Sequence, residues 1–183
     1  MLIILEGING VGKSYLAKRL SEEYEIPIYK TFGKEREKLP EGKNREFFLS
    51  SFQKGLFDWA VADFLNQVPS DVIMDRSIIS SYPYGDDENL ELIKEWWKLC
   101  PDRTMIFFLY SMEVDKIQDR RKDDSFLAIS KDADYLQQRY FDLFSKIVGM
   151  KSHLFKFCVD GTSKEEMYAM VSDEVRYALS ENL

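Results

Sequence analysis

The feature that most constrains this chain is the segment GINGVGKS at residues 7–14. It fits the phosphate-binding pattern GxxxxGK[ST], follows the apolar run Leu2–Leu5, and precedes a stretch with helical spacing. In such a loop, glycines let successive backbone N–H groups turn toward phosphate oxygens, and the start of the helix adds partial positive charge. The order of strand, loop and helix predicts an α/β fold with a phosphate site at its first turn.

Two side chains of this segment carry the expected chemistry. Lys13 is expected to reach the β- and γ-phosphates of a bound nucleotide, and the Ser14 hydroxyl is expected to ligate Mg²⁺. The other positions contribute backbone N–H groups. The residues expected to bind the phosphates of ATP are Asn9, Gly10, Val11, Gly12, Lys13 and Ser14.

The rest of the chain alternates short apolar runs with longer amphipathic stretches, without an internal repeat or a linker of domain-boundary size. We therefore expect a single domain over residues 1–183, folded as a three-layer sandwich with a five-stranded parallel sheet. The predicted strands are Leu2–Leu5, Ile26–Tyr29, Val72–Met74, Met105–Tyr110 and Leu154–Val159. The predicted helices are Lys13–Tyr24, Arg45–Asn66, Glu88–Lys98, Glu113–Arg121, Asp132–Val148 and Ser163–Leu179.

The charge, the cysteine content and the amino-terminal sequence argue against several classes of protein. Its net charge is −7, which argues against a surface built mainly for nucleic acid. Its two cysteines are far apart in the sequence, so neither a disulfide framework nor a zinc site is indicated. The apolar run at the amino terminus stops at Glu6 and is too short for a signal peptide or a membrane span. We expect a cytoplasmic protein.

A second motif is VIMDRS, at residues 72–77, where an apolar strand ends in an acid. Beside the phosphate loop, Asp75 is placed to hold Mg²⁺ directly or through water. The alternative is that Asp75 caps the following helix. Arg76 favours the first interpretation, because a guanidinium can grip a second phosphate with two hydrogen bonds.

Two charged segments and one aromatic stripe allow two interpretations each. The run DRRKDD at residues 119–124 is either a passive turn or a short lid whose arginines supply cations during phosphoryl transfer. The segment at residues 30–45 is either a substrate loop or a solvated connector. Helical spacing favours core packing over a ligand site for Tyr135, Leu136, Tyr140, Leu143, Phe144 and Ile147.

With these residues in view, the chain resembles the thymidylate kinase family of P-loop deoxynucleoside monophosphate kinases, and more broadly the related deoxynucleoside kinases. The resemblance rests on LEGINGVGKS (5–14), IMDRSIISSYPY (73–84), the stretch at 120–124, the helix ending in Tyr140 and CVDGT (158–162). It implies a sheet of the nucleotide kinase type, ATP with Mg²⁺ as phosphoryl donor, a deoxynucleoside 5′-monophosphate as acceptor, and commonly a homodimer.

The resemblance also assigns roles to single residues. Lys13, Asp75 and Arg76 match catalytic positions, and Ser14 with Asp75 matches the metal site. A lid is implied at about 118–130, with Arg120 and Arg121 as its catalytic cations, and an acceptor-binding loop and helix at about 30–60. The acceptor-side residues are Asn9, Phe52, Gln53 and Arg76, and the adenine loop is Asp160, Gly161 and Thr162. The family's Arg-Glu-Pro signature after the second strand is missing here, and Lys30, Arg36 and Arg45 are the candidates to hold the acceptor phosphate in its place.

Three other functions compete with this assignment. A deoxynucleoside kinase needs a carboxylate base near the end of the second strand, whereas this sequence has Lys30 there and no acid before Glu35. A kinase of modified bases within DNA is disfavoured by the net charge of −7. A GTPase-like switch is disfavoured because the chain contains no Asn-Lys-x-Asp tetrapeptide.

Overall fold

The computed structural model describes residues 1–30, 51–68, 70–85, 87–119, 133–147 and 153–180; for residues 30, 51–57, 118 and 119 it describes the backbone only. These residues form one sheet of five parallel strands in the order β2-β3-β1-β4-β5. The strands are β1 (Leu2–Glu6), β2 (Ile28–Lys30), β3 (Val72–Asp75), β4 (Thr104–Tyr110) and β5 (His153–Cys158).

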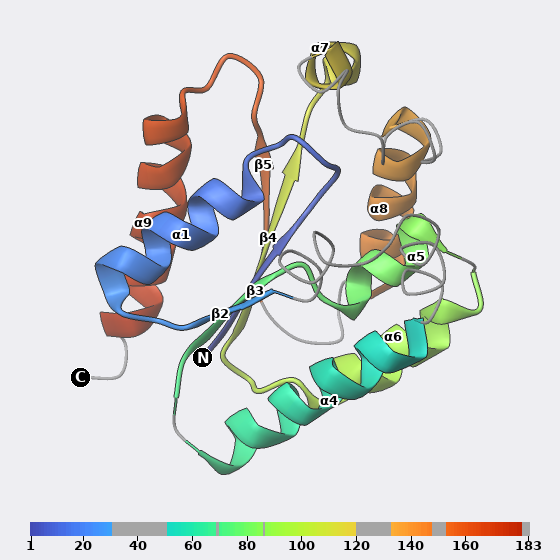
Figure 1. Cartoon of the computed structure of the whole chain (residues 1–183), viewed down its shortest axis with the longest axis vertical. Coiled ribbons are helices and arrows are strands. Elements are labelled where there is room, and N and C mark those ends of the chain that lie inside the picture. Colours follow the sequence, from blue (N-terminus) through green and yellow to red (C-terminus); the bar gives the residue numbers. More distant parts are fainter. Residues whose placement is uncertain (31–50, 69, 86, 120–132, 148–152, 181–183) are drawn as a thin grey trace, which may run out of the picture.

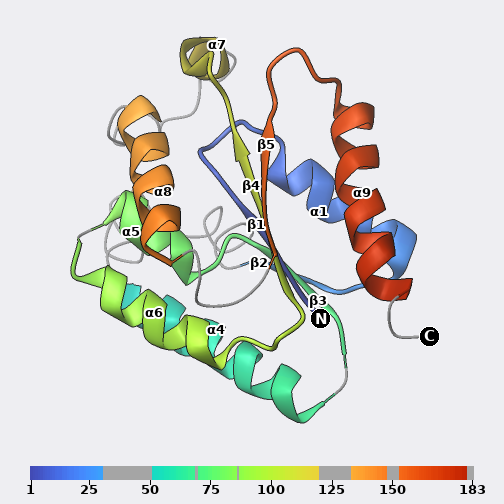
Figure 2. The same ribbon diagram turned by 180° about the vertical axis from the view of Figure 1, so that it is seen from behind.

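Helices cover both faces of the sheet (Figures 1 and 2). On one face lie α1 (Lys13–Tyr24) and α9 (Lys164–Ser180). On the other lie α4 (Ser51–Gln67), α5 (Ser81–Tyr84), α6 (Asn89–Leu99) and α8 (Ala133–Ile147). The short helix α7 (Val114–Asp119) stands beyond the carboxyl end of β4, and a 3-10 turn, η1 (Ile78–Ser80), precedes α5. The predicted three-layer α/β architecture is confirmed.

The core follows the position of each strand. Every residue of the central strand β1 is buried, because helices cover it on both sides. Neighbouring residues of β4 point to opposite faces, so Phe107 stacks on Phe155 at 5.1 Å while Phe108 packs against Phe144 at 5.0 Å. The edge strand β5 is only half-buried.

Most predicted boundaries are correct to within two residues. β2 begins at Ile28 rather than Ile26, because Pro27 has no N–H to donate to the ladder. The described part of the long second helix starts at Ser51, so the predicted start at Arg45 lies outside the described residues. On α8 the predicted packing face is buried except for Tyr135, which is 44% exposed and lies beside the Arg139 guanidinium.

Among the residues that the structure describes, no helix is both long enough and apolar enough to cross a bilayer.

Candidate active site

The phosphate loop joins β1 to α1 at the carboxyl edge of the sheet. Its three glycines, at positions 7, 10 and 12, have φ angles of 137°, 96° and 100°. At Gly7 the requirement is steric as well, because a Cβ there would lie 2.2 Å from the carbonyl oxygen of Leu109. The loop therefore runs in contact with the end of β4, and only glycine permits that approach.

Lys13 lies inside this loop. Its side chain is only 6% exposed, and its Nζ donates to the carbonyl oxygen of Ile8 over 2.6 Å. Val11 packs into the core while Gly10 stays exposed, which fixes which side of the loop faces the solvent. The ammonium is therefore held against the backbone of the loop, where a bound polyphosphate would receive it.

Ser14 and Asp75 meet where the adjacent strands β1 and β3 end. The Leu5 and Asp75 positions are paired in the sheet register, and Ser14 Oγ donates to Asp75 Oδ2 over 2.6 Å. Asp75 does not cap the next helical turn; the Ser77 side chain does, by accepting from the Ile79 N–H. This geometry therefore does not support Asp75 as a helix cap.

This pair fits Mg²⁺ by the chemistry of its donors, a hydroxyl and a carboxylate oxygen. Within the described ranges, no group of three or more histidine, cysteine, aspartate or glutamate side chains gathers as a metal cluster. Mg²⁺ suits such a sparse site, because it keeps several waters and takes other ligands from substrate phosphates.

Arg76 is the cation beside the loop. It has a φ of 73°, rare for a residue with a side chain, and its N–H donates to the carbonyl of Leu5 over 3.1 Å. Its Nη2 donates to Asn9 Oδ1 over 2.6 Å and to the Tyr84 hydroxyl over 3.1 Å. The guanidinium also lies 4.9 Å from the centre of the Tyr84 ring. Strained backbone of this kind often marks a functional position.

The surroundings keep Arg76 charged. Burial alone would lower the pKa of Arg76, but the hydroxyls of Tyr84 and Tyr140 and the carboxylate of Glu6 outweigh burial and raise that pKa above its ordinary value. Burial first, and then the charge of Glu6, raise the pKa of Tyr140 well above its usual range. At physiological pH the site therefore offers a permanent cation and a protonated phenol.

Several of these partners were not predicted from the sequence. Glu6 stood out only as the acid that ends an apolar run, although an acid at the end of a buried strand is a signal in itself. Tyr140 packs in the core as predicted, but its hydroxyl reaches the Arg76 guanidinium at 3.2 Å. Asp58 on α4 is fully buried and accepts the N–H of Ile78, and no spacing rule singled it out.

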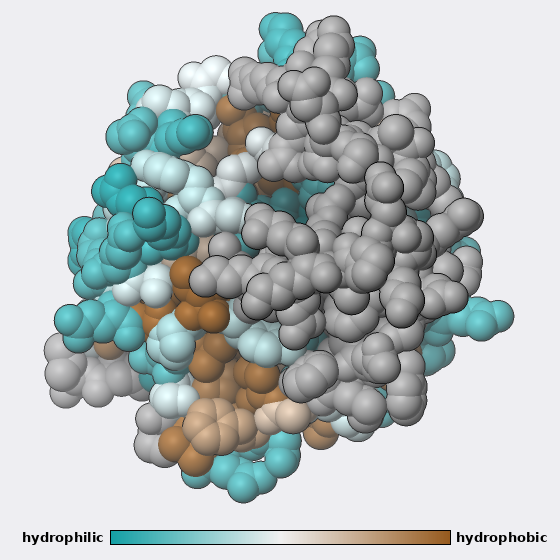
Figure 3. Space-filling view, viewed as in Figure 1, coloured by the Kyte–Doolittle hydropathy of each residue, from teal (hydrophilic) through white to brown (hydrophobic). Residues whose placement is uncertain are grey.

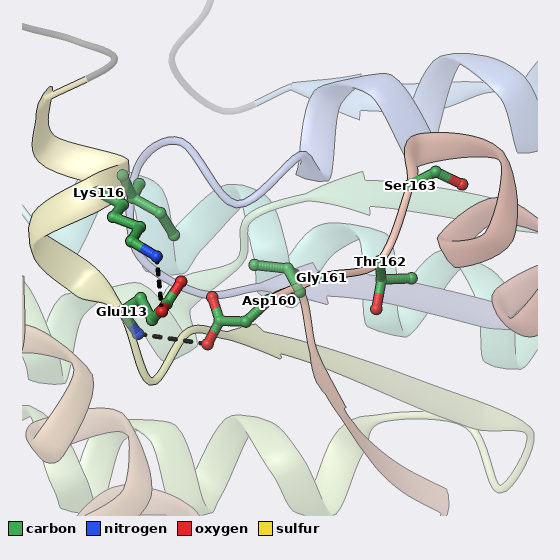
Figure 4. Close-up of a pocket in the computed structure, with 8 residues that line it drawn as sticks. Glu113, Lys116, Asp160, Gly161, Thr162 and Ser163 are labelled. Atoms are coloured by element: carbon green, nitrogen blue, oxygen red, sulfur yellow. Dashed lines mark hydrogen bonds and ion pairs between the residues drawn. The ribbon is translucent and has the colours of Figure 1, made fainter.

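A pocket of about 370 Å³ opens at the same edge, between the start of α7 and the loop from β5 to α9 (Figure 4). Gly161, Thr162 and Ser163 line one side, and Glu113 and Lys116, joined by a 2.7 Å ion pair, line the other. This is where the predicted adenine loop falls. The Ser163 and Glu166 side chains cap each other's backbone N–H groups at the start of α9, which fixes the end of that loop.

Asp160 links the two sides of this pocket by hydrogen bonds. It accepts hydrogen bonds from the Ser111 hydroxyl and from the backbone N–H groups of Met112 and Glu113. Partial burial works to raise the pKa of Asp160, but these hydrogen bonds outweigh it and the net pKa lies below the usual value. Because its oxygens are engaged in this way, Asp160 shapes the pocket through the β4–α7 turn.

The remaining predicted site residues are placed only in part. Lys30 ends β2 and is paired in register with Asp75, so its backbone lies at the correct edge. Phe52 and Gln53 belong to the first turn of α4, where the backbone alone is described. Predictions that fall outside the described residues are Arg36, Arg45, Arg120, Arg121 and most of the lid at 118–130.

Solved structures with this fold are nucleotide and nucleoside kinases, among others. Thymidylate kinase from Candida albicans superposes with a TM-score of 0.65 at 16% identity, over 96% of this chain and 91% of that chain. Deoxyadenosine kinase from M. mycoides, with the products dCMP and dCDP, gives 0.62 at 14% identity, over 97% of this chain and 100% of that chain. YorR from Bacillus subtilis, in complex with phosphorylated GDP, gives 0.62 at 23% identity over 96% of both chains.

At these identities the likeness defines the fold, which is that of the P-loop nucleotide kinases and is related to that of the deoxynucleoside kinases. The predicted sheet of the nucleotide kinase type is confirmed. No protein-family model matches the chain, and no curated protein matches it.

Proposed function

We propose that the protein is a cytoplasmic phosphotransferase that moves the γ-phosphoryl group of ATP to a deoxynucleoside 5′-monophosphate, giving the diphosphate. The observation that carries this proposal is the contact of 2.6 Å between Arg76 Nη2 and Asn9 Oδ1. It places a permanent cation directly beside the loop that would hold the donor phosphates. Kinases of this fold among the solved structures support phosphoryl transfer as the reaction class.

On the donor side, the phosphate loop supplies backbone N–H groups and Lys13 supplies an ammonium for the β- and γ-phosphates. Ser14 and Asp75 would hold Mg²⁺, which neutralises phosphate charge when it is bound. The adenine would occupy the pocket at Gly161 and Thr162. Since the carboxylate of Asp160 is engaged with the β4–α7 turn, we expect the backbone and not Asp160 to contact the base.

A monophosphate acceptor fits the charges better than a nucleoside does. Transfer to a nucleoside needs a carboxylate to take the proton of the 5′-hydroxyl. The described carboxylates at this edge already accept hydrogen bonds: Glu6 from Ser77, Asp75 from Ser14, and Asp160 from the β4–α7 turn. A monophosphate brings its own anionic oxygen and needs cations, which Arg76 provides.

Further roles follow from the resemblance and extend the proposal. Arg120 and Arg121 would close over the transferring group as lid cations. Phe52 or Gln53 would face the acceptor base. Lys30 or Arg45 would hold the acceptor phosphate in place of the arginine that the family has after the second strand and this chain lacks.

The test is a substrate panel. Purified protein is incubated with Mg-ATP and each of the deoxynucleosides and their 5′-monophosphates, and the products are separated by ion-exchange chromatography. We expect diphosphates from one or more monophosphates and no product from nucleosides. Product from nucleosides alone would overturn the choice of acceptor, and transfer at an undiminished rate in Lys13→Ala would show a contaminating kinase.

We also propose a homodimer, as the resemblance implies. Three exposed apolar side chains, Phe64, Val68 and Leu99, lie at the adjoining ends of α4 and α6, which the Asn66 amide joins by donating to the Leu99 carbonyl. Hydrophobic side chains gather over α4 at the bottom of Figure 3, whereas α1 and α9 present mostly hydrophilic ones. Sedimentation equilibrium tests this proposal: a mass of 21.6 kDa at all concentrations would contradict it.

A further inference from the structure

Glu6 is a buried carboxylate that the roles above leave unexplained. It is the last residue of β1 and is fully buried. One carboxylate oxygen, Oε1, accepts from the N–H of Ser77 over 2.7 Å and from its hydroxyl over 2.8 Å. The other oxygen, Oε2, accepts from Ser80 Oγ over 2.7 Å and from the Tyr140 hydroxyl over 3.0 Å. Within the described residues Glu6 makes no direct ion pair, so hydroxyls and one amide solvate its charge.

The same two hydroxyls contact Arg76. Its Nη1 lies 3.2 Å from Ser80 Oγ and 3.2 Å from the Tyr140 hydroxyl. A guanidinium only donates, and each hydroxyl carries a single proton, so both hydroxyls must turn lone pairs toward Arg76 and protons away from it. Both hydroxyls lie within donating distance of Oε2, and because they lie 2.9 Å apart, one can also donate to the other, which then donates to Oε2. The carboxylate of Glu6 therefore decides which way the hydroxyls point.

We propose that Glu6 is the positioning residue of the acceptor site: by fixing the hydroxyl protons of Ser80 and Tyr140, its carboxylate holds the Arg76 guanidinium beside the phosphate loop. This inference rests on the proposed function, since it assigns the held guanidinium to the acceptor phosphate. The hydrogen bonds run from Glu6 through the two hydroxyls to Arg76 and on to Asn9 of the loop. This series of hydrogen bonds would let Arg76 bind an incoming phosphate without first changing its conformation.

Glu6→Gln tests the direction of these hydrogen bonds with little change in shape. The N–H of Ser77 cannot reverse, so the glutamine carbonyl oxygen must take the position of Oε1 and the amide nitrogen that of Oε2. That nitrogen donates to the hydroxyls of Ser80 and Tyr140, and their protons must then turn toward Arg76 or toward each other. Arg76 Nη1 then loses acceptors at Ser80 and Tyr140, and the guanidinium is held only from its other side, by Asn9 and Tyr84.

In steady-state assays, we expect Glu6→Gln to raise the KM of the acceptor on the order of 10- to 100-fold, while the KM of Mg-ATP changes little. Tyr140→Phe keeps the ring that packs 5.3 Å from Phe108 but removes one hydroxyl. It should shift the acceptor KM in the same direction by a smaller factor. The effects of the two substitutions should not add in the double variant, because both act through the same contact with Arg76.

Glu23→Gln is the matched control. Glu23 also accepts from a tyrosine hydroxyl, that of Tyr168, and from a serine hydroxyl, that of Ser172, but these join α1 to α9 far from Arg76 in the hydrogen-bond network. It should leave both KM values unchanged. Transfer by the wild-type chain with an unchanged acceptor KM in Glu6→Gln overturns the inference about Glu6 alone. If Glu6→Gln does not fold, an unchanged acceptor KM in folded Tyr140→Phe overturns it instead. An inactive wild-type chain overturns the proposed function itself.

Discussion

Replacing Gly7 by alanine tests whether the phosphate loop has to run against the end of β4. A Cβ at Gly7 would lie 2.2 Å from the carbonyl oxygen of Leu109 and 3.2 Å from Val11 Cγ2. Relaxed carbon–oxygen contacts are about 3.3 Å or longer, so the loop or the strand must move by roughly 1 Å. The nearest atom belongs to the backbone of β4, a buried inner strand, which has little freedom to move.

The cost has two parts. An alanine forced to a φ of 137° loses about 1–3 kcal/mol, and overpacking a well-filled site loses a further 1–3 kcal/mol or so. Gly7→Ala should therefore lower the free energy of unfolding by about 2–6 kcal/mol, a large share of the stability of a domain of this size. The loop should also lose its affinity for ATP.

Gly161→Ala is the control that separates the two parts. Gly161 has a φ of 70° but no atom within 4 Å of an added Cβ, so it carries the conformational cost alone, about 1–2 kcal/mol. Urea unfolding followed by circular dichroism, without nucleotide, measures both variants. A loss in Gly7→Ala no greater than that in Gly161→Ala would refute the claim that the loop touches β4.

Three other predictions concern the proposed chemistry, and a fourth concerns the stability of the fold. Lys13→Ala should lower kcat on the order of 100- to 1000-fold, since it removes the cation at the transferring phosphates; a coupled ADP-release assay measures this. Asp75→Asn should raise the Mg²⁺ concentration needed for half-maximal rate, and an unchanged Mg²⁺ titration curve would argue against a metal role. Arg120→Ala and Arg121→Ala should lower kcat more than they raise the KM of ATP, whereas equal losses would mean that these arginines bind only the ground state. Asp160→Asn should destabilise the fold by about 1 kcal/mol at pH 7. Because the pKa of Asp160 is below its unfolded value of 3.8, this stabilisation is complete above that value and disappears as pH falls through the folded pKa. Urea unfolding of both proteins across pH 3–7 checks the sign.

The fold was predictable because its signals are local. Apolar runs such as Leu2–Leu5 announce strands covered on both faces, and amphipathic stretches between them announce crossover helices. The predicted start of β2 is two residues early, because the apolar pattern does not register that Pro27 lacks the N–H that a strand donates to its neighbour. Tyr135 is predicted to lie in the core because helical spacing indicates which side of a helix is buried but not how wide the buried side is. Tyr135 lies at the margin of the buried side of α8 and is exposed.

Part of the candidate site was predictable because its residues lie within short sequence motifs whose spacing is known. The spacing of GINGVGKS identifies Lys13 and Ser14 as candidate site residues, and the end of a neighbouring strand identifies Asp75, which contacts Ser14. The network around Arg76 was not predictable in this way, because its members come from β1, the phosphate loop, the η1 turn, α5 and α8. Tyr140 is 134 residues from Glu6, and no single-sequence pattern links residues so distant.

Isothermal titration calorimetry with ATP, in the presence of Mg²⁺ and again in EDTA, tests the central claim most directly. In the proposed mechanism, residues 7–14 bind a nucleotide's phosphates, and Ser14 and Asp75 hold the metal. We therefore predict that the wild-type protein binds one ATP per chain and that the affinity falls sharply in EDTA. Lys13→Ala should bind ATP weakly under both conditions. ATP affinity that is absent, or that is the same with and without Mg²⁺, would contradict the account.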